Sequence, residues 1–289
     1  LITVNGAYFF IKDFTITRAI IKIKSVWSRK MEDDIGYMRV RNFAKKTTDE
    51  VEAALGKMSK DTPLKGLVLD LRNNPGGLLN QSIGVSNLFL KKGALIVYTE
   101  GRTPDQNMSF VTEKGSKYVD LPLVILVNGG SASASEIVAG ALKDKNRAIL
   151  MGTKTFGKGS VQTIIPLSDG SGLRLTTAKY FTPSGKVIEN NGIMPNIIVE
   201  NPVISSVAKE EKSEKELNVN REKDDSTHIS GAKNKISDKE NKQPVNNKLK
   251  DQIEALFLKA YKKDIQLQRA VELLKGVEIF QDLLQKKAS

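Results

Sequence analysis

The sequence predicts an α/β fold built around a mixed sheet, with a strand-rich N-terminal segment and helices at the C-terminus. Two short apolar runs, at residues 67–71 and 121–127, each lead into a Gly-rich turn and then into a segment with helical apolar spacing. Such runs are typical of buried strands, and their alternation with helices is typical of a sheet that contains parallel strands. The length of 289 residues, 39% of them hydrophobic, allows a sizeable core.

The N-terminal elements are expected to be strands followed by one helix. Residues 1–35 form a basic segment whose alternating stretch at residues 20–24 is typical of an exposed strand, and residues 36–41 alternate like a half-buried strand. Thr47 and Glu50 have the spacing of a capping box, and apolar residues follow at helical spacing. The pattern therefore predicts a helix that begins near Thr47.

The central segment, residues 36–202, holds the alternating core. The two buried runs each pass through a turn into a helix, predicted over residues 78–90 and 133–142. Further strands are expected at residues 148–151, 160–167 and 173–181.

Residues 203–250 predict a disordered polar linker. This stretch is rich in Lys, acidic residues and Asn and has no aromatic residue, so it cannot bury enough apolar area to offset its ordering entropy. His228 lies within it, which favours a solvated residue over a functional one. Residues 251–289 then form a C-terminal segment of two amphipathic helices, whose apolar faces need a partner surface.

The composition excludes several classes of function. The chain has no Cys and one His, which excludes disulfides, thiolate nucleophiles and sites that need two His ligands, and we expect no cofactor or metal. The 45 basic and 33 acidic residues give a net charge of +12. Because no nucleic-acid-binding motif accompanies this charge, we expect no nucleic acid partner and favour either a solvated basic face or peripheral contact with an anionic membrane. No uncharged apolar run reaches the roughly 20 residues of a membrane span.

A serine cluster is the candidate nucleophile. Without His or Cys, a nucleophilic enzyme must use Ser or Thr with a lysine, carboxylate or terminal amine as base. Residues 130–136, Gly-Ser-Ala-Ser-Ala-Ser-Glu, join a buried strand to a helix, so Ser133 would face the unpaired N–H groups of the helix N-terminus. Ser133 and Glu136 also fit a capping box, and a role limited to capping stays open.

A lysine loop follows at residues 152–162. It approaches the phosphate-loop pattern, but Gly159 stands where the magnesium-binding hydroxyl is needed, and a strand is expected in place of the phosphate-binding helix. We therefore reject nucleotide binding. A solvated lysine remains the alternative for Lys158, since most lysines are exposed.

Five motifs occur in order along the chain: Asp-Leu-Arg-Asn-Asn-Pro-Gly-Gly at 70–77, Val-Asn-Gly-Gly-Ser-Ala-Ser-Ala-Ser-Glu-Ile at 127–137, the loop at 152–162, Tyr-Phe-Thr-Pro-Ser-Gly at 180–185 and Gly-Ile-Met-Pro at 192–195. Together they resemble the carboxyl-terminal processing (tail-specific) proteases, the S41 serine peptidase family, and residues 266–274 are similar to the family's ending. The resemblance implies a protease core of the ClpP/crotonase-like type. It also implies a preceding PDZ domain, of which only the last strands are expected, within residues 1–18.

The resemblance assigns roles to individual residues. It implies that Ser133 is the nucleophile, Lys158 the general base and Gln162 the residue that orients the lysine. A lysine acts as a base only when neutral, which requires burial or nearby positive charge. The Asn-Pro-Gly-Gly turn can form a backbone nest, although simple chain reversal stays open. The candidate oxyanion donors are the N–H groups of Gly76, Gly77 and Ala134.

The serine and lysine motifs predict a serine endopeptidase that acts through an acyl-enzyme, and the resemblance implies that it cuts proteins near their C-termini. The resemblance implies substrates with accessible C-termini, an adaptor or activator protein, self-association through the C-terminal helices, and a periplasmic or extracytoplasmic location at the bacterial inner membrane. One alternative is a catalytically impaired peptide-binding or scaffold fragment, because most of the PDZ domain is absent from the sequence. A less favoured alternative is a crotonase-like acyl-CoA enzyme, since no carboxylate stands beside the Gly-Gly turn.

Overall fold

A six-stranded mixed sheet forms the centre of the molecule. A computed structural model describes residues 3–4, 7–8, 24–200 and 247–288. The strands of the sheet are β3 (Val26–Lys30), β4 (Ile35–Val40), β5 (Gly66–Asp70), β8 (Leu123–Val127), β9 (Ile149–Gly152) and β12 (Ile197–Ile198). Their order is β12-β9-β8-β5-β4-β3, and all neighbours are parallel except β3, which is antiparallel to β4. The predicted α/β class with a mixed sheet is confirmed.

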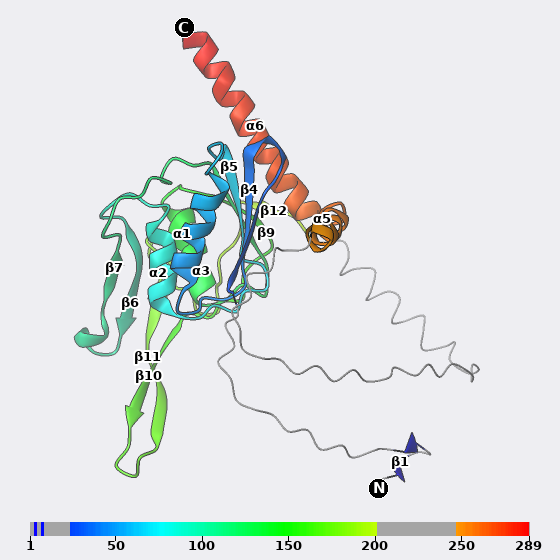
Figure 1. Cartoon of the computed structure of the whole chain (residues 1–289). Coiled ribbons are helices and arrows are strands. Elements are labelled where there is room, and N and C mark those ends of the chain that lie inside the picture. Colours follow the sequence, from blue (N-terminus) through cyan, green and yellow to red (C-terminus); the bar gives the residue numbers. More distant parts are fainter. Residues whose placement is uncertain (1–2, 5–6, 9–23, 201–246, 289) are drawn as a thin grey trace, which may run out of the picture.

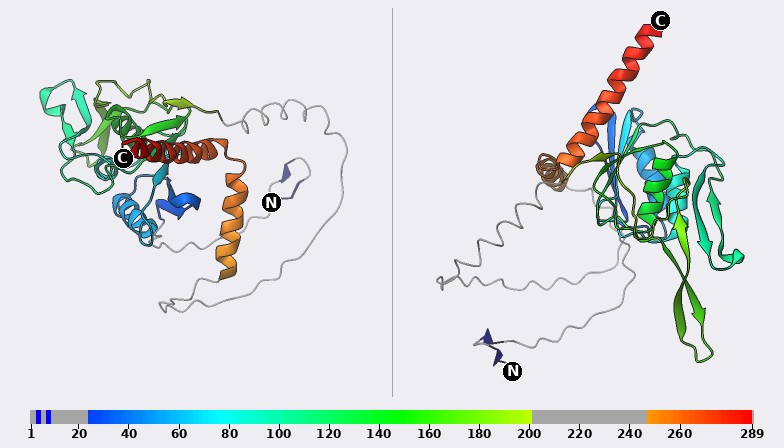
Figure 2. Two further views of the ribbon diagram at one scale, coloured as in Figure 1. Left: turned by 90° about the horizontal axis from the view of Figure 1, so that it is seen from above. Right: turned by 180° about the vertical axis from the view of Figure 1, so that it is seen from behind.

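Helices cover both faces of this sheet (Figure 1, Figure 2). One face carries α1 (Thr47–Met58), α2 (Leu79–Asn87) and α3 (Ala134–Asp144), and the other carries α5 (Asn247–Tyr261) and α6 (Ile265–Ala288). Each face has its own cluster of buried apolar side chains. β5 and β8 are buried along their whole length, which explains why they are continuous apolar runs in the sequence.

The C-terminal helices find the partner surface that their apolar faces require. Leu267, Ala270, Val271 and Leu274 of α6 are buried against side chains of β5 and β8. Phe257 of α5 lies against Trp27 and Tyr37, with ring centroids 5.4 and 5.7 Å away. The remainder of α6 extends past the body of the molecule (Figure 1).

A second, antiparallel sheet has the order β10-β11-β6-β7. Its strands are β6 (Leu95–Gly101), β7 (Ser109–Val111), β10 (Ser160–Pro166) and β11 (Gly172–Phe181). The β10–β11 hairpin agrees with the sequence prediction and extends away from the body (Figure 1). The sequence analysis did not predict β6 and β7, because they are half-exposed or short and carry no regular alternation.

The remaining short elements are β1 (Thr3–Val4), which pairs with β2 (Ala7–Tyr8), and the 3-10 turns η1 (Glu32–Asp34) and η2 (Pro104–Gln106). Most of the strand predicted at residues 20–24, most of the predicted linker and His228 lie outside the described residues. No helix among the described residues is both long enough and apolar enough to cross a membrane.

Two details of the sequence prediction are wrong. Lys46, and not Thr47, is the N-cap of α1, and no side-chain hydrogen bond caps this helix. The carboxylate of Glu50 instead accepts the Ser25 N–H (2.8 Å) and the Ser25 hydroxyl (2.7 Å), because the start of β3 offers it donors that the capping pattern ignores. In addition, α5 begins at Asn247, before the predicted end of the linker at residue 250, because its first turn carries a single apolar residue, Leu249, among polar ones.

Candidate active site

Three loops that carry the predicted site follow three adjacent parallel strands, β5, β8 and β9. The carboxyl ends of parallel strands meet at one edge of a sheet, so these loops converge there. Asn128 Oδ1 accepts the Asn73 N–H (2.9 Å) and Asn128 Nδ2 donates to Asn73 Oδ1 (3.0 Å), which joins the first two loops. The Phe156 N–H donates to Ser131 O (3.0 Å), which joins the second loop to the third.

Ser133 occupies a strained turn between β8 and α3. It is the N-cap of α3, with φ 53° and ψ −115°, a conformation that non-glycine residues rarely adopt. Such strain costs roughly 1–3 kcal/mol and persists only where neighbouring contacts enforce it. In α/β-hydrolases, a comparable strained turn between a strand and a helix exposes the hydroxyl of a nucleophilic serine.

The hydroxyl groups of the two neighbouring serines are engaged in hydrogen bonds with backbone carbonyl groups. Ser131 and Ser135 are completely buried, whereas Ser133 is half-buried. The Ser131 hydroxyl donates to Leu71 O (2.8 Å), and the Ser135 hydroxyl donates to Asn74 O (2.9 Å). Of the three serines, Ser133 is therefore the one that a substrate can reach.

The buried carboxylate of Glu136 joins the serine turn to the lysine loop. Its Oε2 accepts the backbone N–H of Ser133 (2.8 Å) and the backbone N–H of Lys158 (2.8 Å). Its Oε1 accepts the Thr155 hydroxyl (2.6 Å) and the Gly157 N–H (2.7 Å). The backbones of the two predicted catalytic residues thus meet at a single oxygen atom. The capping-box spacing predicted the bond to Ser133, but no sequence signal predicted the other three.

Lys158 lies in the loop between β9 and β10, and its side chain is exposed. The flanking glycines allow a close approach of the backbone, since a Cβ at Gly159 would clash with Glu189 and Ile188. The burial that a lysine base requires is not supplied by the described residues.

The candidate oxyanion donors differ in their availability. The Gly76 N–H donates to Asn74 Oδ1 (2.9 Å), so it is already engaged. Among the described residues, the N–H groups of Gly77 and Ala134 have no hydrogen-bond acceptor. Gly76 instead allows close packing, because a Cβ there would lie 2.6 Å from Ala132 O and 2.8 Å from Ser133 Cβ.

Gln162 lies on β10, where the pairing with β11 is interrupted between Val161 and Gln162. Its side chain is exposed, and within the described part of the chain no hydrogen bond joins it to Lys158. No group of three or more His, Asp or Glu side chains among these residues is arranged to hold a metal ion.

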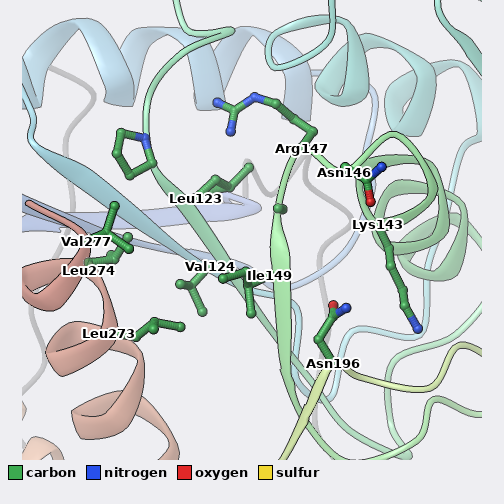
Figure 3. Close-up of a pocket in the computed structure, with 12 residues that line it drawn as sticks. Leu123, Val124, Lys143, Asn146, Arg147, Ile149, Asn196, Leu273, Leu274 and Val277 are labelled. Carbon is green, nitrogen blue, oxygen red and sulfur yellow. The ribbon is translucent and has the colours of Figure 1, made fainter. Parts of the chain in front are cut away.

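One pocket of about 280 Å³ lies away from these loops, between β8, β9 and α6 (Figure 3). It is lined by apolar residues such as Leu123 and Leu274 and by Arg147. The Arg147 guanidinium donates to the carbonyl oxygens of Phe89, Tyr118 and Leu121, which makes it a structural residue. This pocket contains none of the predicted site residues.

The model of peptidase family S41 matches residues 34–199, a segment that contains all three loops. The chain belongs to peptidase family S41. This S41 core carries the fold and motifs of a serine-type peptidase.

Relatives of this S41 chain include carboxyl-terminal processing proteases. It is 53% identical over 194 residues to a carboxy-terminal-processing protease of Bartonella bacilliformis, covering 66% of this chain and 44% of the relative. It is 46% identical over 199 residues to the corresponding protease of Synechocystis, covering 67% and 45%. A solved photosystem II D1 C-terminal processing protease matches with a TM-score of 0.57 at 35% identity, covering 62% of this chain and 49% of that one. The S41 chain thus spans less than half the length of these curated relatives.

Proposed function

We propose that this chain is a serine endopeptidase that cleaves protein substrates near their C-termini, with Ser133 as nucleophile and Lys158 as general base. The observation that carries the proposal is the shared Glu136 oxygen, which accepts the backbone N–H groups of both residues at 2.8 Å. The loops after β8 and β9 are thereby joined at one oxygen atom, which brings the backbones of the proposed nucleophile and base close together. The specificity for C-termini rests on the names of the similar proteases.

The proposed reaction has two steps, acylation of Ser133 and hydrolysis of the acyl-enzyme. The Ser133 hydroxyl attacks the scissile carbonyl carbon while the neutral amine of Lys158 takes the hydroxyl proton. The C–N bond then breaks, and the proton passes from Lys158 to the leaving amine, which leaves an ester on Ser133. A water molecule, deprotonated by Lys158, hydrolyses this ester and releases the new C-terminus, and the proton returns to Ser133.

Backbone N–H groups stabilise the negative oxygen that forms during attack. The N–H groups of Ala134 and Gly77 are the two candidates that remain without an acceptor among the described residues. Ala134 begins α3, so the partial positive charge of the helix N-terminus adds to its effect. In this proposal, Gln162 orients the side chain of Lys158, as the family pattern implies. The bound substrate removes water from around the exposed amine of Lys158.

The partners follow from the same proposal. Substrates are polypeptides with accessible C-termini, and an adaptor or activator protein presents them at the extracytoplasmic face of a bacterial membrane. Self-association through the end of α6 is supported by four apolar side chains that are more than half exposed: Ile279, Phe280, Leu283 and Leu284.

Cleavage of unfolded β-casein tests the proposed roles. Ser133→Ala is expected to lower kcat/KM by at least about 10³-fold, because the nucleophile is lost. Lys158→Arg is expected to lower it by roughly 10²–10⁴-fold, because a guanidinium is permanently protonated and cannot accept a proton.

Lys154→Arg is the matched control, since Lys154 is an equally exposed lysine of the same loop. The Lys154→Arg variant should keep the kcat/KM of the wild type. An active Lys158→Arg enzyme would contradict the assignment of the base. If the wild-type chain is folded but shows no Ser133-dependent cleavage, the result would favour the alternative hypothesis of a catalytically impaired peptide-binding or scaffold fragment.

A further inference from the structure

A saturated ion-pair network joins the C-terminal helices to the loop after β5. Arg72 is the second residue after β5, and Asp264 lies in the short connection between α5 and α6. Arg72 Nη1 and Nη2 donate to the two carboxylate oxygens of Asp264 at 2.9 and 2.7 Å. Arg72 Nε and Nη2 donate to the two oxygens of Asp70 at 3.0 and 2.7 Å. The guanidinium therefore forms a two-pronged contact with each carboxylate.

Gln266 completes the network. Its Oε1 accepts the remaining N–H of Arg72 Nη1 (2.9 Å), and its Nε2 donates to Val199 O (2.6 Å). All five N–H donors of the guanidinium are thus occupied, three of them by the C-terminal segment. Arg72 is 9% exposed, Gln266 3% and Asp70 0%. The guanidinium of Arg72 is therefore held between Asp70 of β5 and the C-terminal segment.

The turn that follows Arg72 is hydrogen-bonded to the segment around Ser133. Two residues further along the chain, Asn74 O accepts the Ala132 N–H (2.9 Å) and the Ser135 hydroxyl (2.9 Å). Asn74 Oδ1 accepts the Gly76 N–H (2.9 Å). The residues on both sides of Ser133 are therefore bonded to the turn that begins at Arg72.

We propose that Asp264 and Gln266 are positioning residues for catalysis, which act through Arg72 on the turn that carries Gly76 and Gly77 and supports Ser133. This inference rests on the proposed peptidase function. It assigns the C-terminal helical segment a role in the reaction, although residues 264–266 lie outside the segment matched by the family model, residues 34–199.

Asp264→Asn separates this role from a merely structural one. Asp264 Oδ1 also accepts the Leu267 N–H (3.0 Å) at the start of α6, and Asn serves as an N-cap as well as Asp does. The substitution therefore keeps the helix cap. It places an amide NH₂ group against Arg72 Nη2, so a donor faces a donor and the two-pronged contact is lost.

Glu278→Gln is the matched control. Glu278 of α6 pairs with Lys65 at 2.6 Å, so this variant makes the same carboxylate-to-amide change in the same segment. It removes an ion pair between α6 and the core but leaves the Arg72 network intact.

In casein cleavage, Asp264→Asn should lower kcat about tenfold or more with little change in KM, because a small displacement of the oxyanion donors impairs the transition state more than binding. Labelling of Ser133 by a fluorophosphonate should slow by a similar factor. Amide hydrogen exchange should become faster at the hydrogen-bonded N–H groups of Asn73, Asn74 and Gly76 and at Ala132. Glu278→Gln should change none of these quantities.

Two results would overturn the inference. One is an Asp264→Asn protein with a lowered melting temperature but with wild-type kcat and wild-type exchange at residues 73–77. The other is an equal loss of kcat in Glu278→Gln, which would reflect general loosening of α6. If the wild type neither cleaves casein nor labels at Ser133, the proposed function fails, and the exchange measurement still decides whether Asp264 holds the turn.

Discussion

Glu136 is a buried, fully used hydrogen-bond acceptor at the centre of the candidate site. Its carboxylate is completely buried and receives four donors from three segments: Ser133, Thr155 and the stretch Gly157 to Lys158. Bonds to a charged acceptor are stronger than bonds between neutral groups, which offsets the cost of burying the charge. Glu136 can therefore hold Ser133 in a strained backbone conformation.

Glu136→Gln should damage both stability and activity. Gln offers one acceptor oxygen where Glu offers two, so its NH₂ group would face two of the four donors. Each donor left unpaired costs roughly 1–3 kcal/mol of unfolding free energy. A displacement of Ser133 relative to Lys158 should also lower kcat on the order of 10²-fold. Urea unfolding and casein cleavage measure the two effects.

Glu189→Gln provides the comparison. The Glu189 carboxylate accepts one backbone N–H, that of Gly159 at 2.6 Å, and a Gln side chain keeps an acceptor for it. This variant should stay close to wild type in both assays. Equal effects in the two variants would argue against a special role for the four bonds of Glu136.

The turn between β5 and α2 packs closely against Ser133, the proposed nucleophile. Gly76 and Gly77 both have positive φ, at 97° and 147°. Phe43 packs against Gly77 so closely that a side chain there would overlap the Phe43 backbone. The glycines are thus required both by backbone conformation and by the approach of neighbouring segments.

Gly76→Ala should lower activity by more than the backbone strain of an alanine at positive φ accounts for. Its Cβ would lie 2.8 Å from Ser133 Cβ and 2.9 Å from Ala134 N, so the serine turn must move. We expect a loss of kcat on the order of 10²-fold, measured with casein.

Gly93→Ala separates strain from contact. Gly93 also has a positive φ, 79°, but a Cβ there would meet nothing within 4 Å. Both variants should lose about 1 kcal/mol or more of unfolding free energy from backbone strain, while only Gly76→Ala should lose activity. Loss of activity in Gly93→Ala would show that strain anywhere in the core is sufficient.

For the molecule as a whole, the C-terminal helices complete the fold, because α6 covers the face of the sheet that α1, α2 and α3 leave open. The Arg72 network fixes this layer at the end of the sheet that carries the site. Burial opposes ionisation of Asp264, but the hydrogen bonds and charge of Arg72 outweigh it and lower the pKa of this carboxyl.

This pKa shift predicts acid sensitivity of the whole fold. A carboxyl whose pKa is lowered in the folded state contributes stability above its ordinary pKa of 3.8, and that contribution is lost as the pH falls through the folded value. At pH 7, Asp264→Asn should be less stable than wild type by about 1.5–3 kcal/mol. The difference in unfolding free energy between wild type and Asp264→Asn should become smaller as the pH falls from 3.8 towards the pKa of Asp264 in the folded state. Melting curves at several pH values can measure this change. A difference that is independent of pH would exclude the charge of Asp264 as its source.

The sequence by itself determined the α/β class, the order of the core elements and the loops that carry Ser133 and Lys158. It could do so because buried strands, helical spacing and Gly-rich turns are local patterns. It did not reveal β6 and β7, the partner of Glu50, or the four-donor role of Glu136. Only the tertiary structure decided these features, and the pairing of Arg72 with Asp264, because that contact spans 192 residues. Such a contact depends on how the chain folds back on itself and leaves no periodicity or motif in either segment.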